Sequence, residues 1–522
     1  MLRHRVEILV IGSGFAGSLM AMIARRLGFS TALLERGRHP RFAIGESSTP
    51  LANLLLEEIA DDYELPGVRP FSKWGTWQKH APQVACGLKR GFTFYHHELG
   101  RSFKSDSRRQ RQLLVGASPR DEIADTHWYR PDFDHYLVQQ ARALGVEYWD
   151  GVKLTRANAE SNRIRVGGER QGQSVEFVGQ LVIDASGPRG FLYRALKLRE
   201  SPFRTLPPTQ ALFSHFADVA PLPNCFSTND LTPPYPPEDA AVHHIFDGGW
   251  IWVLKFNNRV TSAGVAATDA LAKVLNLRSG EPAWVRLLSL LPSLAESFHS
   301  ARKVVPFIYQ PRIAFQSRQI IGANWALLPS AAGVIDPLLS TGFPLALLGI
   351  SRLGQILKRH WQKPSFGGEM EEYARLTALE LKTTARLVGA LYATMNRFGL
   401  FKALTLLYFA VASYSEAARR LGKGHLAESF LLSGHPGFSR GLRQACSLAH
   451  DRPSAGLNTK FKRLVNETIA PFDVAGLADG TRHPWYPARP EDLLASGAKI
   501  GATQDEIIAM LSKCGMAMEH RE

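Results

Sequence analysis

A lysine inside an aromatic stretch is the first residue of this chain that could do chemistry. Lys89 lies in GLKRGFTFYHH, residues 87–97. A buried primary amine has a lowered pKa and can act as an acid, a base or a nucleophile. The alternative is a solvated lysine on a strand edge, where lysine is common. On one extended strand, Lys89 and Gly91 would share a face with room for a small substrate, and Phe92 would lie on the opposite face.

A glycine-rich turn near the start of the chain could hold a nucleotide diphosphate. The apolar run VEILVI ends in GSGFAG, and SLMAMIARRLG then has the pattern of a helix. The spacing G-x-G-x-x-G permits a tight turn and a close backbone approach to phosphate, and an acidic residue ends the next predicted strand, STALLER. A glycine-rich loop without a ligand is the alternative. The residues predicted to hold the dinucleotide here are Gly12, Gly14, Phe15, Ala16, Gly17, Glu35 and Arg36.

The elements that must position these residues alternate between strands and helices. Residues 130–149 are typical of an amphipathic helix followed by a strand, and residues 179–187 of an apolar strand that ends in a turn. GGWIWVLKF and RVTSAGVAA have the pattern of further strands. From about residue 366 the pattern becomes helical.

Composition and charge limit the classes of protein. The 522 residues are 45% hydrophobic and 21% charged, which is the balance of a folded globular protein. A formal charge of +15 suits acidic partners, but the chain has no nucleic-acid-binding motif. The four cysteines form no CxxC pair, so we expect no metal site and a reducing, cytoplasmic location. The apolar stretch 403–414 is shorter than the roughly 20 residues of a membrane-spanning helix, so we expect a buried helix or a face that contacts lipid.

Four further motifs carry a family resemblance. They are RFAIGESSTP (41–50), WYRPDFDHYL (128–137), VIDASG (182–187) and AAGVIDPLLSTG (331–342). Together with the glycine-rich turn they resemble the flavin-dependent halogenases and the wider FAD-dependent monooxygenase and reductase superfamily. The resemblance spans about residues 5–350 and implies FAD rather than NAD. The FAD-binding residues that it adds are Gly45, Glu46, Ser47, Arg130, Asp184, Ser330, Asp336 and Gly342.

The resemblance also implies the architecture. We expect an α/β fold with a doubly wound, Rossmann-type FAD-binding domain, an interleaved antiparallel-sheet substrate domain and a C-terminal helical region. Residues 1–365 would form the FAD-binding domain, with the substrate-side sheet from about 50–130 and 200–320. Residues 366–522 would be mainly helical and cap the substrate side.

Two tryptophans resemble the pair that separates halogenases from flavin monooxygenases. Trp250 and Trp252 lie in GGWIWVLKF. In the family these indoles lie near the flavin and keep organic substrate away from it, so the resemblance implies a flavin-shielding role. Lys255 stands where the family has proline, so we expect the strand to run on where halogenases bend. Alternation of side chains across a half-buried strand is the other explanation of the spacing.

The segment DPLLSTG (336–342) resembles the one whose backbone amides hold halide against the flavin ring. The resemblance makes the amides of Thr341 and Gly342 the ligands of chloride or bromide. Successive N–H groups in a turn that leads into a helix form a concave anion site. Tryptophan-directed members have a glutamate where this chain has Leu339, so we expect a phenolic or pyrrolic substrate.

Lys89, Gly91 and Phe94 match the K-x-G-x-x-F pattern that carries the active-site lysine of halogenases. The resemblance implies that Lys89 meets hypohalous acid formed at the flavin, as a hydrogen-bond donor or as a chloramine, and delivers halogen to an arene. Arg90 is a poorer candidate because of its higher pKa and delocalised charge.

Three hypotheses follow. The first is a halogenase that takes reduced FAD from a separate flavin reductase, uses oxygen and chloride or bromide, and acts on an electron-rich aromatic, either free or tethered to an acidic carrier protein. The second is an FAD-dependent monooxygenase or dehydrogenase acting directly on an aromatic or a lipid, with Lys89 only structural. The third is a flavin-binding protein that docks on a membrane or carrier protein without turnover.

Overall fold

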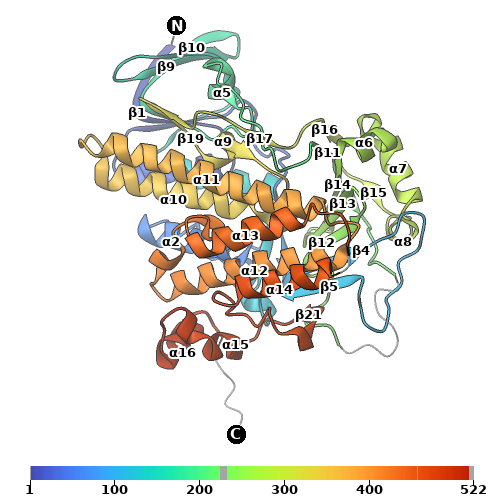
Figure 1. The fold of residues 1–522 in the computed structure, drawn as a ribbon. Helices are drawn as coiled ribbons and strands as arrows, with labels where there is room; N and C mark the ends of the chain where they lie inside the picture. Colours follow the sequence, from blue (N-terminus) through green and yellow to red (C-terminus); the bar gives the residue numbers. More distant parts are fainter. Residues whose placement is uncertain (1, 224–231, 455, 517–522) are drawn as a thin grey trace.

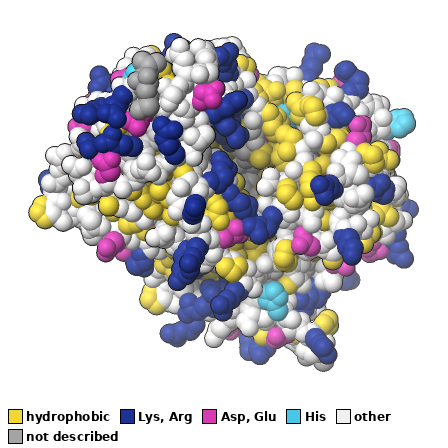
Figure 2. Space-filling view, turned by 90° about the horizontal axis from the view of Figure 1, so that it is seen from above, with side chains coloured by type: hydrophobic (Ala, Val, Ile, Leu, Met, Phe, Trp, Pro, Cys, Tyr) yellow, Lys and Arg dark blue, Asp and Glu magenta, His cyan; other side chains and the backbone are white. Residues whose placement is uncertain are grey.

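The computed structural model describes residues 2–223, 232–454 and 456–516 (Figure 1). Two sheets and a set of long helices from the C-terminal part of the chain form the body of the molecule. Seen from above, Lys and Arg side chains gather along a depression near the middle of the surface (Figure 2). The fold class predicted from the sequence is confirmed.

The first sheet is built around β1 (Leu2–Ile11), which pairs in parallel with β2 (Thr31–Leu34) and β10 (Gln173–Asp184). The strand order is β18-β19-β10-β1-β2-β7, and β8 and β9 continue it beyond β10 as antiparallel strands. Parallel strands covered on both faces are buried, as the apolar and buried residues 8–11 at the end of β1 indicate. The other bounds are β7 Glu147–Trp149, β8 Lys153–Ala159, β9 Ile164–Arg170, β18 Ile321–Gly322 and β19 Trp325–Leu327.

The second sheet has the order β15-β11-β14-β13-β12-β4-β5-β21, with β16 also paired to β11. Most pairs are antiparallel, as predicted, but β12 with β4 and β5 with β21 are parallel. The bounds are β4 Gly91–His96, β5 Gln112–Gly116, β11 Thr209–Ala217, β12 Ala241–Phe246, β13 Gly249–Lys255, β14 Val260–Thr268, β15 Arg302–Lys303, β16 Ile308–Gln310 and β21 Trp485–Tyr486.

Two short strand pairs lie outside these sheets, and one of them holds Lys89. Strand β3 (Cys86–Lys89) pairs with β6 (Asp125–Trp128), and β17 (Phe315–Gln316) pairs with β20 (Gly333–Val334). The expectation of one extended strand through Lys89 and Phe92 is therefore wrong. The chain leaves β3 at Arg90 and enters a different sheet with β4.

The C-terminal helices pack against both sheets. Helix α12 (Phe398–Arg420) contacts α2, α11 and α14 and lies beside β4 and β5 (Figure 1). It is longer than the apolar stretch predicted from the sequence, and its length and composition would allow it to cross a membrane. However, 78% of its most apolar window is buried inside the protein, which is typical of a core helix.

The remaining helix bounds are α1 Phe15–Arg26, α2 Pro50–Asp62, α3 Trp74–His80, α4 Arg130–Ala143, α5 Phe191–Ala195, α6 Asp269–Leu275, α7 Glu281–Ser289, α8 Pro292–Ser297, α9 Pro329–Ala332, α10 Gly342–His360, α11 Phe366–Tyr392, α13 Pro436–Leu448, α14 Leu457–Ile469, α15 Pro490–Ala495 and α16 Gln504–Lys513. The helices predicted after the glycine-rich turn and over residues 130–143 are confirmed. Helix α1 packs on α4 and α10, so the turn before α1 lies close to both.

Candidate active site

The glycine-rich turn after β1 leaves no room for side chains. Gly12 has a φ of +98°, which favours glycine, and a Cβ there would lie 2.8 Å from the backbone of Ala185. A Cβ on Gly17 would lie 1.8 Å from the carbonyl oxygen of Gly12. Gly14 is the N-cap of α1, and no described side chain caps the helix. The turn therefore presents bare N–H groups at a helix N-terminus, as a diphosphate site requires.

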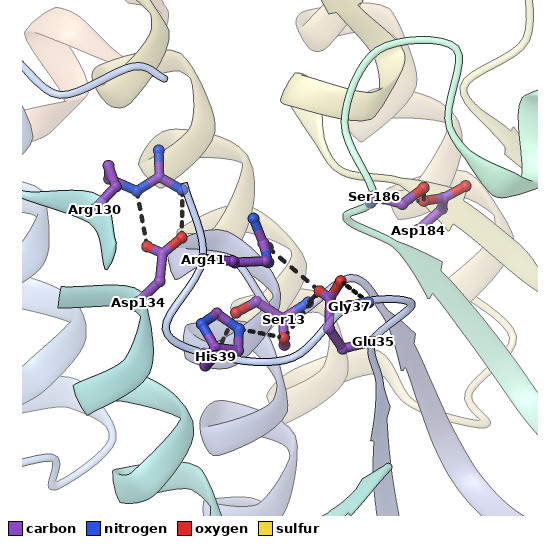
Figure 3. Close-up of polar contacts among 10 residues, drawn as sticks. Ser13, Glu35, Gly37, His39, Arg41, Arg130, Asp134, Asp184 and Ser186 are labelled. Atoms are coloured by element: carbon purple, nitrogen blue, oxygen red, sulfur yellow. Dashed lines mark hydrogen bonds and ion pairs between the residues drawn. The ribbon is translucent and has the colours of Figure 1, made fainter. Parts of the chain in front are cut away.

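Two arginines face this turn. Arg130, at the start of α4, makes two hydrogen bonds of 2.8 Å to Asp134, and both residues are buried (Figure 3). The position of a Cβ on Gly14 lies 3.3 Å from Nη2 of Arg130 and 3.7 Å from Nη2 of Arg41. Nη1 of Arg130 donates to the carbonyl oxygen of Gly45 at 2.9 Å. Positive charge is thus held beside a helix N-terminus, which favours an anionic ligand.

Glu35 lies at the carboxyl end of β2, beside the same turn. Its carboxylate accepts hydrogen bonds from the amide and hydroxyl of Ser13, at 3.0 and 2.9 Å, and from the amide of Gly37 at 2.8 Å (Figure 3). Burial alone would raise the pKa of Glu35, but Arg41 and these donors outweigh it and lower the pKa. Glu35 is therefore an ionised acceptor where a ribose would lie. Arg36, predicted beside it, is exposed.

The first residues of α1 link the turn to α10. Phe15 and Ala16 are buried, so they offer backbone amides rather than side chains to a ligand. The ring of Phe15 packs edge-on against Trp128 and Phe343, with centroids 5.5 and 5.0 Å away. Since Phe343 follows Gly342 in the first turn of α10, the two helix N-termini are held together.

Asp184 and Ser330 lie at the same end of the first sheet. Asp184 is buried, and its carboxylate accepts hydrogen bonds from the amide and hydroxyl of Ser186 and from the amide of Leu192. Ser330 is half-buried in α9. Cofactor binding by these two side chains stays a prediction.

The turn at Gly12, the two arginines beside Gly14 and the ionised carboxylate of Glu35 together fit the diphosphate and ribose of FAD.

The segment containing Glu46 and Ser47 is tied to the second sheet and to the predicted catalytic lysine. Oε1 of Glu46 lies 2.7 Å from Nε2 of His215, and both side chains are buried. The hydroxyl oxygen of Ser47 accepts a hydrogen bond from Lys89 at 3.0 Å. Ser47, predicted for the cofactor, therefore connects that segment to the lysine. Its contact with FAD stays a prediction.

The turn before α10 has an unusual backbone. Leu339 and Ser340 have φ values of +66° and +55°, in the left-handed region that residues with side chains rarely adopt. Thr341 is buried and is the N-cap of α10. A Cβ on Gly342 would meet no described atom within 4 Å, so the space there is open. Since the first amides of a helix have no acceptor within it, those of Thr341 and Gly342 suit an anion.

Asp336 ties this turn to the tryptophan strand. Its Oδ1 accepts hydrogen bonds from the amide of Leu338 at 3.1 Å and from the indole of Trp250 at 3.3 Å. Its Oδ2 accepts one from the hydroxyl of Tyr392 at 2.9 Å. Burial raises the pKa of Asp336 to about 6. Both oxygens thus bind protein groups, and a contact between Asp336 and the cofactor stays a prediction.

Trp250 and Trp252 are two residues apart on β13, so they project from the same face. Both are buried, with ring centroids 5.7 Å apart, and His243 stacks on Trp250 at 5.2 Å. Strand β13 continues through Lys255, which pairs with Thr261. Lys255 is the last residue of β13, so the strand includes the position where the family has proline and ends there.

Lys89 is fully buried, with 0% of its surface exposed. Its ammonium donates hydrogen bonds to the hydroxyl of Ser47 and the carbonyl of Ser48, and it lies 3.7 Å from the ring centroid of Phe92. The alternative of a solvated strand lysine is excluded. The prediction that Lys89 and Phe92 lie on opposite faces of one strand is also wrong. The break between β3 and β4 brings the ring of Phe92 close to the ammonium of Lys89.

The space predicted beside Gly91 is filled. A Cβ on Gly91 would lie 2.3 Å from the carbonyl oxygen of Val115 and 2.9 Å from the ring of Tyr235. Gly91 therefore permits close packing of the second sheet rather than access for a substrate.

A carboxylate that the sequence analysis did not identify faces Lys89. Asp125 is the partner of Lys89 across β3 and β6, and it is also buried. Its Oδ1 accepts a hydrogen bond from Asn53 at 2.8 Å, and its Oδ2 accepts none from the described residues. Burial lowers the pKa of Lys89, and the charge of Asp125 acts in the opposite direction. The amine is thus desolvated and controlled by one carboxylate.

An apolar cavity of about 160 Å³ lies between the second sheet and the C-terminal helices. Phe92 and Thr49 line it on the side of Lys89. Tyr408 lines it from α12 and donates a hydrogen bond of 3.0 Å to the carbonyl oxygen of Leu339. The side chain of Phe92 therefore lies between the cavity and Lys89, and the side chain of Tyr408 lies between the cavity and the predicted halide turn.

Halogenases are the known proteins to which this chain is similar. The family model described as tryptophan halogenase matches residues 125–400, more than half of the 522-residue chain. The monodechloroaminopyrrolnitrin halogenase of Pseudomonas fluorescens is 29% identical over 78% of this chain and 71% of its own length. The tetracycline 7-halogenase of Kitasatospora aureofaciens is 27% identical over 76% of this chain and 72% of its own length.

A solved structure extends the similarity beyond the matched segment. The crystal structure of halogenase PltM in complex with phloroglucinol and FAD has a TM-score of 0.77 and 25% identity, covering 91% of this chain and 98% of that chain. The chain thus belongs to the tryptophan halogenase family and is a flavin-dependent halogenase that uses FAD and a halide to halogenate aromatic compounds.

Proposed function

We propose that this halogenase acts on a free, one-ring phenol and that Lys89 delivers the halogen. The observation that carries the proposal is a fully buried amine one aromatic ring away from an apolar cavity. The cavity volume of about 160 Å³ resembles that of a cavity of roughly 150 Å³ that binds benzene. The complex of PltM with phloroglucinol supports the same substrate class.

The proposed roles follow from the geometry. Reduced FAD, when bound, would supply together with oxygen the oxidising equivalent that converts halide into hypohalous acid. The amides of Thr341 and Gly342 hold the halide, and Trp250 and Trp252 keep organic molecules away from it. Lys89 donates a hydrogen bond to the oxygen of hypohalous acid. As an arene carbon bonds to the halogen, the halogen–oxygen bond breaks, and the leaving hydroxide takes a proton from the ammonium to become water. The arenium ion then loses its ring proton to water, which restores the aromatic ring, and the amine of Lys89 is protonated again by solvent.

The proposed partners are those expected from the sequence. A separate flavin reductase would supply reduced FAD in the cytoplasm. A pyrrole tethered to an acidic carrier protein is the second candidate substrate, because the net charge of +15 suits an acidic partner. That association should weaken as ionic strength rises, and binding that is unaffected by moderate salt would count against it.

Asp125→Asn should shift the pH profile of halogenation toward lower pH by about one unit. The substitution removes the negative charge that favours protonated Lys89, so the pKa of Lys89 falls further. The part of the pH profile that follows the titration of Lys89 then moves to lower pH. This holds whether the ammonium or the free amine of Lys89 is the active form. Rates of product formation measured from pH 5 to 10 check this, and an unchanged profile would show that Asp125 does not control the amine.

The proposed function is tested by supplying the FAD-loaded protein with regenerated reduced FAD, oxygen, bromide and phloroglucinol. We expect bromophloroglucinol that depends on bromide, identified by mass spectrometry. A hydroxylated product that forms without any halide would overturn the proposal in favour of direct oxygenation.

A further inference from the structure

A few charged side chains line the cavity beside Lys89. Its lining is mainly apolar, and the charged side chains that the described residues contribute are Glu416, Arg420 and Arg489. The first two lie in the last turns of α12, whereas Arg489 is exposed. An apolar cavity with a few placed polar groups is the usual form of a small-molecule site, because those groups set the orientation of the ligand.

The carboxylate of Glu416 is held in one position. Its Oε1 accepts a hydrogen bond of 2.7 Å from Nε of Arg420, and Nη1 of the same guanidinium lies 3.3 Å from Oε2 of Glu57. The side chains of Glu416 and Arg420 are only 22% and 15% exposed. Arg420 is thus shared between two carboxylates, and its guanidinium fixes the position of the carboxylate of Glu416.

The second oxygen of Glu416 is available to a ligand. Oε2 takes no hydrogen bond from any residue that the structure describes, although the side chain lines the cavity. A fixed carboxylate oxygen at the edge of an apolar space is a strong acceptor for a neutral donor. Burial raises the pKa of Asp125, Glu416 adds to this rise and Arg420 opposes it, so both charges of the pair reach the Lys89 side of the cavity.

We propose that Glu416 is a specificity-determining residue that accepts a hydrogen bond from the phenolic hydroxyl of the substrate on its Oε2. This inference rests on the proposed function and names the group that the site recognises. The hydrogen bond orients the ring and increases the electron density that an electrophilic halogen requires. It also selects against aryl ethers, which lack the donor, and against a carboxylate placed at Glu416, which the like charge of that side chain repels.

The first test is binding of three one-ring ligands to the FAD-loaded protein by calorimetry: resorcinol, 1,3-dimethoxybenzene and 3,5-dihydroxybenzoate. The wild type should bind resorcinol about 10- to 100-fold more tightly than the ether, the range expected for a hydrogen bond to a charged group. It should bind the benzoate more weakly than resorcinol. Equal affinity for resorcinol and the ether, or preferred binding of the benzoate, overturns the inference without any variant.

The second test uses Glu416→Gln, which keeps an acceptor for Arg420 and removes the charge. The ratio of ether to resorcinol dissociation constants should fall to about one third of the wild-type value or lower. The matched control is Glu467→Gln, which alters an exposed Glu–Arg pair at the same i,i+4 spacing in α14, outside the cavity lining. It should keep the wild-type ratio. If Glu416→Gln keeps the wild-type ratio of ether to resorcinol dissociation constants, the inference is contradicted.

The inference and the proposed function fail separately. Bromide-dependent halogenation of monochlorodimedone reports hypohalous acid without a phenol in the cavity. If that activity is present and resorcinol is not preferred, only the role of Glu416 is wrong. If that activity is absent under regenerated reduced FAD, the proposed halogen chemistry is wrong, whatever the binding ratios show.

Discussion

Lys89→Met should lower the rate of phenol halogenation by at least about 100-fold, because a positioned proton donor contributes roughly 10²- to 10⁴-fold. Methionine fills a similar volume and places no charge against Ser47, Ser48 and Phe92. Bromide-dependent consumption of reduced FAD should stay within about twofold of the wild-type rate, since the predicted halide turn is unaltered. Product formation and FAD oxidation, measured in the same reaction, check both parts.

Lys402 provides a matched control. It is also a buried lysine, and it donates a hydrogen bond of 3.0 Å to the carbonyl oxygen of Gln110. Its ammonium lies 5.4 Å from the ring centroid of Phe398, and burial lowers its pKa to about 8. It is not part of the cavity lining. Lys402→Met should therefore halogenate phenol at close to the wild-type rate, and an equal loss in both variants would indicate lost stability rather than lost chemistry.

Lys89→Arg should not restore activity. A guanidinium is larger than an ammonium and keeps its charge at every accessible pH. The pocket formed by Ser47, Ser48 and Phe92 encloses the smaller group completely. If arginine supported halogenation, a general positive charge rather than the amine of Lys89 would be sufficient.

The nucleotide-binding part of the fold could be predicted from the sequence because its determinants are local. The apolar run of β1, the spacing of Gly12, Gly14 and Gly17, and the acid at the end of β2 lie within about 30 residues of one another. The tight turn and the bare amides at the helix N-terminus follow mainly from these neighbours. The second sheet depends on pairings between distant segments, so the parallel partnership of β12 with β4 leaves no local pattern.

The chemistry of the site was predictable only in part. The position of Lys89 in a family pattern was visible, but its burial depends on β6 and on the segment holding Ser47, which are far away in sequence. Asp125 faces it only through strand pairing, so no spacing indicates the contact. Glu416 and Arg420 have the i,i+4 spacing of a solvated helix pair, and only the packing of α12 shows that they line a cavity.

Gly17→Ala should abolish FAD retention because the turn cannot move away from a methyl group. The added Cβ would lie 1.8 Å from the carbonyl oxygen of Gly12 and 3.0 Å from its carbonyl carbon, both backbone atoms. Relief requires a shift of β1 or α1, which would displace the amides of the predicted diphosphate site and cost about 3 kcal/mol of stability. We expect less than about a tenth of the wild-type FAD content after purification and a lower Tm, measured by absorbance and thermal unfolding.

Gly367→Ala distinguishes this steric effect from a general cost of replacing glycine in a helix. Gly367 lies in the first turn of α11, and no described atom lies within 4 Å of a Cβ added there. Alanine is favoured over glycine in a helix by up to about 1 kcal/mol, so this variant should keep its FAD and unfold at the wild-type temperature or slightly above it. If Gly17→Ala also kept stoichiometric FAD, the close packing of the turn would not be what holds the diphosphate, and the arginine pair beside Gly14 would have to account for cofactor binding.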